Sequence, residues 1–272
     1  MMEAMGTAFV KGHATGNDFV VLPDPDGTLD LTPARVAALC DRRRGLGGDG
    51  VLRVVRSSEV SEALPDGQAE WFMDYRNADG SLAEMCGNGV RLFARYLVDS
   101  GLWGGGPRLP ILTRAGLVLA EVGPDGVVAV DMPVPEVAGP GAVRVGELDV
   151  KGTSARCGNP NLVCWFDGID GLDLTQPLGL DRISFPQSAN VEFVERLGER
   201  HVRMRVVERG VGETLSCGSG ACAVAAVARH ESGVDGEIIV DVPGGRLTVA
   251  LTPGRCVLAG PAVIVASGTV SL

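Results

Sequence analysis

Two cysteines stand in the same short motif, one in each half of the chain. Cys86 begins Cys-Gly-Asn-Gly and Cys217 begins Cys-Gly-Ser-Gly, and each motif leads into helix-like sequence. At a helix N-terminus, unpaired backbone N–H groups and the helix dipole favour negative charge, so a thiolate should be accessible there near neutral pH. The motifs predict two reactive thiols that take and give protons.

A thiolate paired with a thiol suits the inversion of a stereocentre, which needs a base on one face of the carbon and an acid on the other. The α carbon of an amino acid is a very weak acid, so the charge that develops on its carboxylate must be stabilised. Two helix N-termini with preorganised N–H groups would do this most strongly in a dry site. Such a reaction would need no pyridoxal phosphate, nicotinamide or metal.

The positions of these motifs indicate a duplicated chain. Gly16-Asn17-Asp18-Phe19 near the start is echoed by Gly158-Asn159-Pro160-Asn161, about half a chain later. After Cys86, one helix face is apolar and a second stripe is polar; the apolar positions are Val90, Phe93, Ala94 and Leu97, and the polar ones Arg91, Arg95 and Asp99. The helix after Cys217 is apolar nearly all round, so we expect it to be buried.

The remaining sequence is typical of short strands between Gly, Pro and Asp turns. A short helix is predicted from Thr32-Pro33 to Cys40, with Thr32 as its cap. The expected strands are 18–22, 51–55, 70–75, 117–122, 127–132, 161–166, 190–194, 202–207, 237–241, 246–251 and 262–266. The sequence thus predicts an α/β (α+β) fold of two strand-rich domains, each wrapped around a central helix, with the active site in a pseudo-twofold cleft.

Composition excludes several other classes of protein. The 272 residues are 45% hydrophobic and carry a formal net charge of -10, so a nucleic-acid partner is disfavoured. No apolar run is long enough for a membrane span, and seven cysteines without dense spacing fit a reducing cytoplasm better than a disulfide framework. Five of them are expected to be small buried hydrophobes: Cys40, Cys157, Cys164, Cys222 and Cys256.

Two other patterns are interpreted as non-functional. Gly45 to Gly50 matches the dinucleotide fingerprint, but it follows a helix and leads into a strand, so we predict a loop. Three histidines and no ligand spacing argue against zinc. His13 is interpreted as structural, and His201 and His230 as surface residues.

A family resemblance becomes specific once all the motifs are taken together. The chain resembles diaminopimelate epimerases in a series of blocks that run in the family order over nearly its whole length. These are Lys11-Gly12-His13, Gly16-Asn17-Asp18-Phe19, Asn77-Ala78-Asp79-Gly80-Ser81, Met85-Cys86-Gly87-Asn88-Gly89, Gly158-Asn159-Pro160, Asn190-Val191-Glu192-Phe193-Val194, Glu208-Arg209-Gly210-Val211-Gly212-Glu213-Thr214 and Cys217-Gly218-Ser219-Gly220.

The resemblance implies a role for each matching residue. Cys86 and Cys217 would be the acid/base pair. The reacting carboxylate would bind to Gly87, Asn88, Gly218 and Ser219, and the reacting ammonium would lie near Asn17. The distal carboxylate would bind to Asn77, Asn159, Asn190 and Arg209, and the distal ammonium to Glu208.

It also implies a fold and a cellular setting. Each domain would be a strongly curved, mainly antiparallel sheet, with residues 1–124 and the returning segment 263–272 in one domain and 125–262 in the other. The activity would interconvert LL- and meso-2,6-diaminopimelate, a small-molecule substrate, for lysine and peptidoglycan precursors. The family suggests a cytoplasmic homodimer without a cofactor.

The chain departs from the family pattern at two positions. Asn161 stands where His usually follows Gly-Asn-Pro, and Gly50 stands where many members have Gln. These changes would loosen contacts around the reacting ammonium or mark a shifted substrate, but they leave both thiols in place.

Several alternatives remain open at this point. A proline racemase or hydroxyproline epimerase shares the paired thiols but usually has His where this chain has Asn88. A phenazine-biosynthesis-type isomerase shares the fold but lacks the cysteine pair. A thiol redox or peroxide-sensing protein would use the same cysteines, and a non-catalytic amino-acid binding module would bind without hydrogen exchange.

Overall fold

A computed structural model describes residues 6–61, 69–233 and 236–272. The chain divides into two compact units, Met1–Val130 with Pro261–Leu272, and Asp131–Gly260. Within the described residues, no helix has the length and apolar character needed to cross a membrane.

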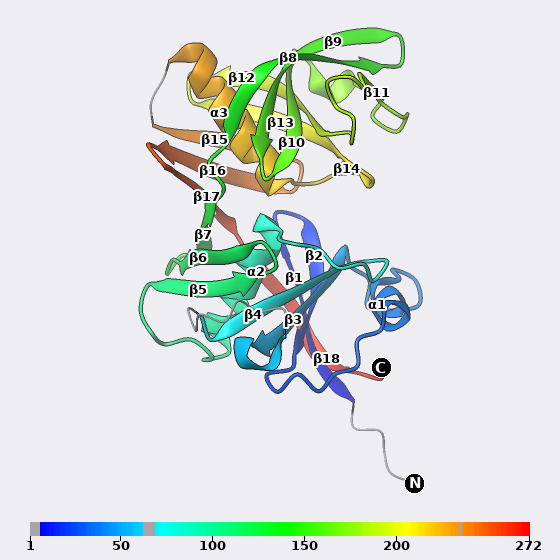
Figure 1. The fold of residues 1–272 in the computed structure, drawn as a ribbon, viewed down its shortest axis with the longest axis vertical. Coiled ribbons are helices and arrows are strands. Elements are labelled where there is room, and N and C mark those ends of the chain that lie inside the picture. Colours follow the sequence, from blue (N-terminus) through cyan, green and yellow to red (C-terminus); the bar gives the residue numbers. More distant parts are fainter. Residues whose placement is uncertain (1–5, 62–68, 234–235) are drawn as a thin grey trace. The chain divides into compact units, whose positions relative to one another are not determined.

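The first unit is a twisted sheet built around one helix (Figure 1). Its neighbouring strands run in the order β18, β1, β2, β3, β4, β5, β6, β7, and only the pairs β2–β3 and β4–β5 are parallel. The elements are β1 Thr7–Ala14, β2 Asn17–Pro23, α1 Pro33–Cys40, β3 Gly50–Arg56, the 3-10 helix Ser57–Glu59, β4 Trp71–Asn77, α2 Gly87–Asp99, β5 Arg108–Thr113, β6 Gly116–Val122, β7 Val127–Met132 and β18 Val263–Val270.

The second unit repeats this plan. Strands β8, β9, β10, β12 and β13 are neighbours in that order, β13 then pairs with β15, and β15 pairs with β16 and β16 with β17; only β10–β12 and β13–β15 are parallel. The elements are β8 Glu136–Val145, β9 Leu148–Cys157, β10 Asn159–Trp165, the 3-10 helix Ile169–Gly171, β11 Gly179–Leu180, β12 Asn190–Gly198, β13 His201–Glu208, β14 Gly212–Thr214, α3 Gly218–Ser232, β15 Glu237–Val242, β16 Gly245–Thr252 and β17 Arg255–Pro261. The predicted fold class is therefore confirmed, and the repeat of strand order supports duplication.

Helices α2 and α3 are the buried centres of their units. The apolar face predicted for α2 is fully buried, and α3 is buried from Gly220 to Ala228. One expectation for α2 needs correction. Arg91 does not lie on a polar outer stripe with Arg95: it is 0% exposed, because its guanidinium donates to Thr15 Oγ1 at 2.9 Å and Asn88 Oδ1 at 2.8 Å inside the unit.

The smaller sequence predictions are mostly confirmed. Thr32 caps α1 through a hydrogen bond from Arg35 N, and the segment from Gly45 to Gly48 is a loop, as expected. The five cysteines expected to be buried are buried. His230 is exposed, and His201 is partly exposed, with its Nε2 2.7 Å from Asp241 Oδ2.

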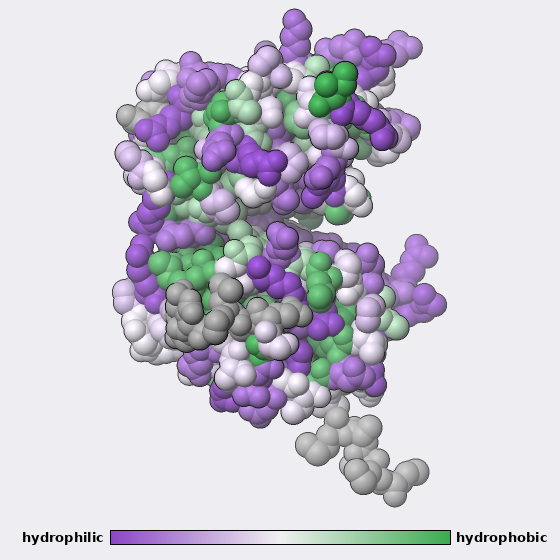
Figure 2. Space-filling view, in the orientation of Figure 1, coloured by the Kyte–Doolittle hydropathy of each residue, from purple (hydrophilic) through white to green (hydrophobic). Residues whose placement is uncertain are grey.

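Several strands were not predicted, namely β1, β5, β8, β9, β11, β14 and β17. One of these, β8, contains Gly139, Pro140 and Gly141, which are typical of turns. The register of β8 against β9 shifts between Val137 and Pro140, so this irregularity accommodates residues that a regular ladder would reject. On the face seen in Figure 2, hydrophilic and hydrophobic side chains alternate over short distances.

Candidate active site

The first half-site is assembled at the N-terminus of α2. Cys86 is the N-cap residue, in extended conformation, and its Sγ accepts a hydrogen bond from Gly89 N at 3.4 Å. The thiol also donates to Asn17 Oδ1 at 3.7 Å, and the same oxygen accepts from Asn88 Nδ2 at 3.2 Å. The structure thus brings together Asn17, Cys86 and Asn88 from positions far apart in the sequence.

Charged partners fix the orientation of both amides. Asp49 Oδ2 accepts from Asn17 Nδ2 at 2.7 Å, so the carbonyl oxygen of Asn17 must be the end that faces Cys86. Arg91 donates to Asn88 Oδ1, so the amide nitrogen of Asn88 points to Asn17. Arg42 in turn donates to Asp49 Oδ1 at 2.7 Å.

Asp18 lies in the same charged group as Asp49. Burial acts to raise the pKa of Asp18, but hydrogen bonds from Arg42 and Lys11 outweigh it and hold that pKa below its ordinary value. The carboxylate therefore stays ionised, and the Lys11–Asp18–Arg42–Asp49 group is a fixed support for Asn17.

The segment that leads to Cys86 is also held by buried charge. Asp74 accepts from Arg114 Nη2 at 2.6 Å, and Arg114 Nη1 donates to the backbone carbonyls of Tyr75 at 3.0 Å and Ala83 at 3.4 Å. Asn77, at the end of β4, donates from Nδ2 to Ser81 Oγ at 3.0 Å across the turn of this segment.

The second half-site is assembled at the N-terminus of α3. Cys217 is again the extended N-cap residue, and its Sγ lies 3.4 Å from Ser219 Oγ. Asn190 Nδ2 donates to Cys217 Sγ at 3.8 Å and to Asn161 Oδ1 at 3.2 Å, while Asn190 Oδ1 accepts from the backbone N–H of Arg209 at 3.0 Å. Gly87 and Gly218 are the first residues of α2 and α3 and are buried.

For Cys217, the structure differs from the expectation of an easily formed thiolate. Burial raises the pKa of Cys217 well above its ordinary value, and the nearby carboxyl groups of Glu208 and Glu192 raise it further. The contact with Ser219 Oγ acts in the opposite direction but does not compensate. Desolvation in the folded unit outweighs the favourable helix N-terminus.

A cavity of about 290 Å³ lies beside the predicted distal-group residues. Glu208 and Arg209 line it, Thr214 Oγ1 donates to Glu208 Oε1 at 2.6 Å, and Arg209 Nη1 donates to the Gln187 carbonyl at 3.3 Å. Its other lining residues are Leu178, Leu180, Ser188, Ala189, Val191, Val207, Gly210, Val211 and Gly212.

Sequence reasoning missed part of this second half-site. Asn161 was treated only as a departure, yet it is fully buried and hydrogen-bonded to Asn190. Ser188 has a φ of 64° and lines the cavity, and no sequence signal marks a serine for that conformation. Asn159 lies at the start of β10, where its side chain is exposed and its carbonyl accepts from Asn161 Nδ2 at 2.8 Å.

Comparison with known proteins identifies the family. A family model described as diaminopimelate epimerase matches residues 9–137 and 153–265. A diaminopimelate epimerase of Thermobifida fusca is 52% identical over 97% of this chain and 98% of its own length. The chain belongs to the diaminopimelate epimerase family. The diaminopimelate epimerase of Streptomyces coelicolor is 50% identical over 96% of this chain and 94% of its own length.

Membership of the diaminopimelate epimerase family makes the chain an isomerase. Solved structures share its fold at low identity: a PhzF-family phenazine biosynthesis protein of Bacillus anthracis has a TM-score of 0.71 at 19% identity, covering 98% of this chain and 99% of its own. A hydroxyproline epimerase of Agrobacterium vitis has a TM-score of 0.69 at 16% identity, covering 100% and 94%. These two likenesses show the fold only. The diaminopimelate epimerases that are about 50% identical to this chain favour that interpretation over the proline racemase alternative.

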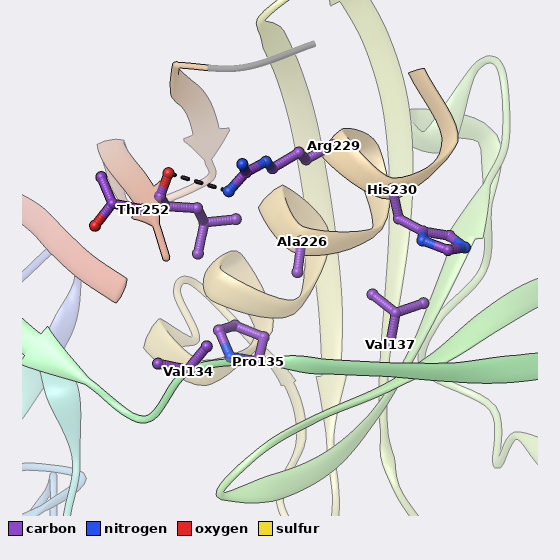
Figure 3. Close-up of a pocket in the computed structure, with 8 residues that line it drawn as sticks. Val134, Pro135, Val137, Ala226, Arg229, His230 and Thr252 are labelled. Atoms are coloured by element: carbon purple, nitrogen blue, oxygen red, sulfur yellow. Dashed lines mark hydrogen bonds between the residues drawn. The ribbon is translucent and has the colours of Figure 1, made fainter. Parts of the chain in front are cut away.

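A second cavity, of about 300 Å³, lies at the C-terminal half of α3 in this family member (Figure 3). Val134, Pro135, Val137 and Ala226 give it an apolar lining, and Arg229 beside it donates to the Leu251 carbonyl at 3.2 Å. It contains none of the predicted site residues. No cluster of three possible metal ligands occurs in the part of the chain that the structure describes.

Proposed function

We propose that this isomerase interconverts LL- and meso-2,6-diaminopimelate by proton transfer between two thiols, Cys86 and Cys217. One observation carries the proposal: each unit presents a cysteine as the N-cap of its central helix, hydrogen-bonded to an amide of fixed orientation. The family relatives named diaminopimelate epimerase support the substrate. A thiolate removes the α proton and a thiol delivers one to the opposite face.

The two helix N-termini stabilise the charge that forms on the reacting carboxylate. Backbone N–H groups at Gly87, Asn88, Gly218 and Ser219 belong to the first turns of α2 and α3, where N–H groups point toward the N-terminus of the helix. They favour the additional negative charge in the transition state, because their dipoles are already oriented. The proposed chemistry needs no metal, pyridoxal phosphate or nicotinamide.

The distal end of the substrate is itself an amino acid, with one ammonium and one carboxylate. In the 290 Å³ cavity, Glu208 supplies the negative charge for the ammonium and Arg209 the positive charge for the carboxylate. Asn77, Asn159 and Asn190 are the proposed amide partners of that carboxylate, and Asn17 lies near the reacting ammonium.

The proposed setting is the synthesis of lysine and peptidoglycan precursors in the cytoplasm, by a homodimer. The two-domain division, 1–124 with 263–272 and 125–262, is proposed as the duplicated architecture that supplies one thiol from each half.

Proton NMR of LL-diaminopimelate with reduced enzyme in deuterated water tests the proposal. We expect deuterium at the α carbon of the meso product, and a loss of turnover of about 10²- to 10⁴-fold in Cys86→Ala and in Cys217→Ala. The variant Cys40→Ala, which changes a buried cysteine outside both motifs, is the control.

Other outcomes would replace the proposal. Exchange with proline or hydroxyproline but not with diaminopimelate would reassign the substrate. Saturable binding without exchange would indicate a binding module. If the wild-type protein showed no turnover, and Cys86→Ala or Cys217→Ala lost only a response to oxidation, the chain would be a redox protein.

A further inference from the structure

Residue 50 in the first unit has no room for a side chain. Gly50 begins β3, where it is aligned with Phe19 of β2 and Asn77 of β4. A Cβ atom added to it would lie 2.5 Å from the backbone oxygen of Arg76 and 2.8 Å from Cε2 of Tyr75. Both distances are shorter than van der Waals contact. The ring of Tyr75 therefore fills the space in which a side chain of residue 50 would begin.

The Tyr75 ring lies at the end of the sheet where the first half-site is assembled. Asn17 is held there by the residue before Gly50, because Asp49 Oδ2 accepts from Asn17 Nδ2 at 2.7 Å. Phe19 follows Asn17 by two residues and so shares its face of the sheet. The rings of Phe19 and Tyr75 meet edge to face, with centroids 5.8 Å apart. Cε2 is bonded to the carbon that carries the hydroxyl, so the hydroxyl end of the Tyr75 ring is the end that reaches Gly50.

The same face of the sheet supports the helix turn next to Cys86. A Cβ atom added to Gly89, in the first turn of α2, would lie 3.7 Å from Phe19 Cζ and 3.5 Å from Cys86 Cβ. The Phe19 ring is thus shared between Tyr75 and the N-terminus of α2. The backbone carbonyl of Tyr75 also accepts from Ala83 N at 3.2 Å, in the segment that leads to Cys86. Tyr75 is half-buried and belongs to the first half-site.

Strand register identifies the counterparts of Gly50 and Tyr75 in the second unit. Gly50 corresponds to Asn190, because each is aligned with the third residue of the preceding parallel strand. Tyr75 corresponds to Val206, because each is aligned with the residue two positions further along the central strand. The aligned pairs are Phe19–Gly50 and Leu52–Tyr75 in the first unit, and Asn161–Asn190 and Glu192–Val206 in the second.

The two units place their large and small residues oppositely at these positions. In the second unit, Asn190 carries the polar group and donates to Cys217 Sγ at 3.8 Å, while the smaller Val206 is fully buried beside it. In the first unit, glycine stands on the central strand and the larger, polar Tyr75 stands on its neighbour. One polar side chain therefore occupies this place in each unit, supplied by different strands.

The chemistry of the first half-site favours an ammonium group as the partner of the phenol. The reacting carboxylate is proposed to bind backbone N–H groups at Gly87 and Asn88, whereas an ammonium group has only donors and needs oxygen acceptors. Asn17 Oδ1 already accepts from the Cys86 thiol and from Asn88 Nδ2. A phenol oxygen is a neutral acceptor, so it adds no negative charge beside a thiolate.

We propose that Tyr75 is a substrate-contact residue of the first half-site: its hydroxyl oxygen accepts a hydrogen bond from the reacting ammonium group, in the place of the side chain that Gly50 lacks. The inference rests on the proposed function, because it assigns one group of diaminopimelate to this residue. The phenol can still donate its own proton to another acceptor while its oxygen binds the ammonium.

The first test is the steady-state kinetics of Tyr75→Phe, which keeps the ring and removes only the oxygen. We expect kcat/KM for LL-diaminopimelate to fall about tenfold, mainly through a higher KM, because the ammonium is bound in both the ground state and the transition state. The control is Tyr96→Phe, which changes the other tyrosine of the chain, buried in α2. It should stay within about twofold of wild type.

The second test observes the phenol directly. The chain contains two tyrosines, so incorporation of fluorotyrosine gives two fluorine NMR signals, which the two Phe variants assign. Saturating LL-diaminopimelate should shift the Tyr75 signal and leave the Tyr96 signal in place. This measurement uses the wild-type sequence, so it decides even if Tyr75→Phe folded poorly.

The outcomes separate this inference from the proposed function. Exchange of LL-diaminopimelate by the wild type is measured first, and its absence would overturn the proposed function and this inference with it. If the wild type exchanges but Tyr75→Phe keeps the wild-type kcat and KM, or the Tyr75 signal does not move, the proposed function stands and the role of Tyr75 is wrong. A lower melting temperature and kcat with an unchanged KM would make Tyr75 structural and also overturn the inference.

Discussion

Asn17 and Asn190 present opposite ends of their amide groups to the two candidate thiols. The Cys86 thiol donates to Asn17 Oδ1 at 3.7 Å, whereas Asn190 Nδ2 donates to Cys217 Sγ at 3.8 Å. Asp49, which only accepts, fixes the first amide, and the backbone N–H of Arg209, which only donates, fixes the second. The half-sites are therefore alike in backbone but different in hydrogen bonding.

The orientation of Asn17 predicts a role for Asp49. In Asp49→Asn, the new amide can donate or accept, so Asn17 is free to turn its nitrogen toward Cys86. We expect kcat/KM for diaminopimelate to fall about tenfold, a loss of about 1.4 kcal/mol in transition-state stabilisation.

The control for Asp49 is Asp30→Asn, which removes an exposed carboxylate paired with Arg35 in the same unit. It should leave kcat/KM within about twofold of wild type, since exposed ion pairs contribute little. An equal loss in both variants would mean that the effect on Asp49 is not specific.

Asn161 is predicted to position Asn190 despite being a departure from the family pattern. In Asn161→Ala, Asn190 Nδ2 loses the oxygen that it contacts at 3.2 Å, so we expect a loss of about tenfold in kcat/KM. Asn161→His keeps a ring nitrogen as acceptor and should lose less. Steady-state kinetics of both variants decides, and a large gain in the His variant would show instead that Asn161 is suboptimal for this substrate.

The pH dependence of stability should contain a contribution from Glu192. Its pKa in the folded chain is raised above the ordinary value of 4.5, so folding takes up a proton. The stabilisation is full below pH 4.5 and is lost as pH rises through the folded pKa. The free energy of unfolding, measured with denaturant at several pH values across this range, should depend less steeply on pH in Glu192→Gln than in wild type. Equal pH dependence in the two proteins would contradict a neutral buried acid.

Asp74 is predicted to be a major determinant of stability near Cys86. It is buried and forms ion pairs with Arg53 at 3.6 Å, Arg76 at 3.0 Å and Arg114 at 2.6 Å. Asp74→Asn removes the buried negative charge that Arg53, Arg76 and Arg114 share, so the free energy of unfolding should fall by about 3–5 kcal/mol.

The sign of the pH effect at Asp74 is opposite to that at Glu192. Burial acts to raise the pKa of Asp74, but hydrogen bonds from Arg76 and Arg114 hold it below 3.8. Its stabilisation is present above pH 3.8 and is lost as pH falls through the lower folded pKa. If the pH midpoint of acid denaturation were the same in Asp74→Asn as in wild type, this role of Asp74 would be contradicted.

The sequence by itself determined the features that depend on local spacing. The two Cys-Gly-x-Gly motifs predicted helix starts at Cys86 and Cys217, and the apolar periodicity after each predicted the buried centres of the two units. Repetition of short blocks predicted a duplicated, strand-rich fold, because strand and helix periods are visible in a single chain. Strands such as β8 were not predicted, because their glycine and proline residues interrupt the strand period and are typical of turns.

Only the tertiary structure decided how distant side chains meet. Arg91 is on the polar side of its own helix by period, yet it is buried because Thr15 and Asn88 accept its hydrogen bonds. The orientation of Asn17 and the position of Glu192 beneath Gly220 depend on strand pairing and on helix packing. Burial also determines how readily Cys217 ionises, because desolvation depends on everything that packs around the sulfur and not on the motif that contains it.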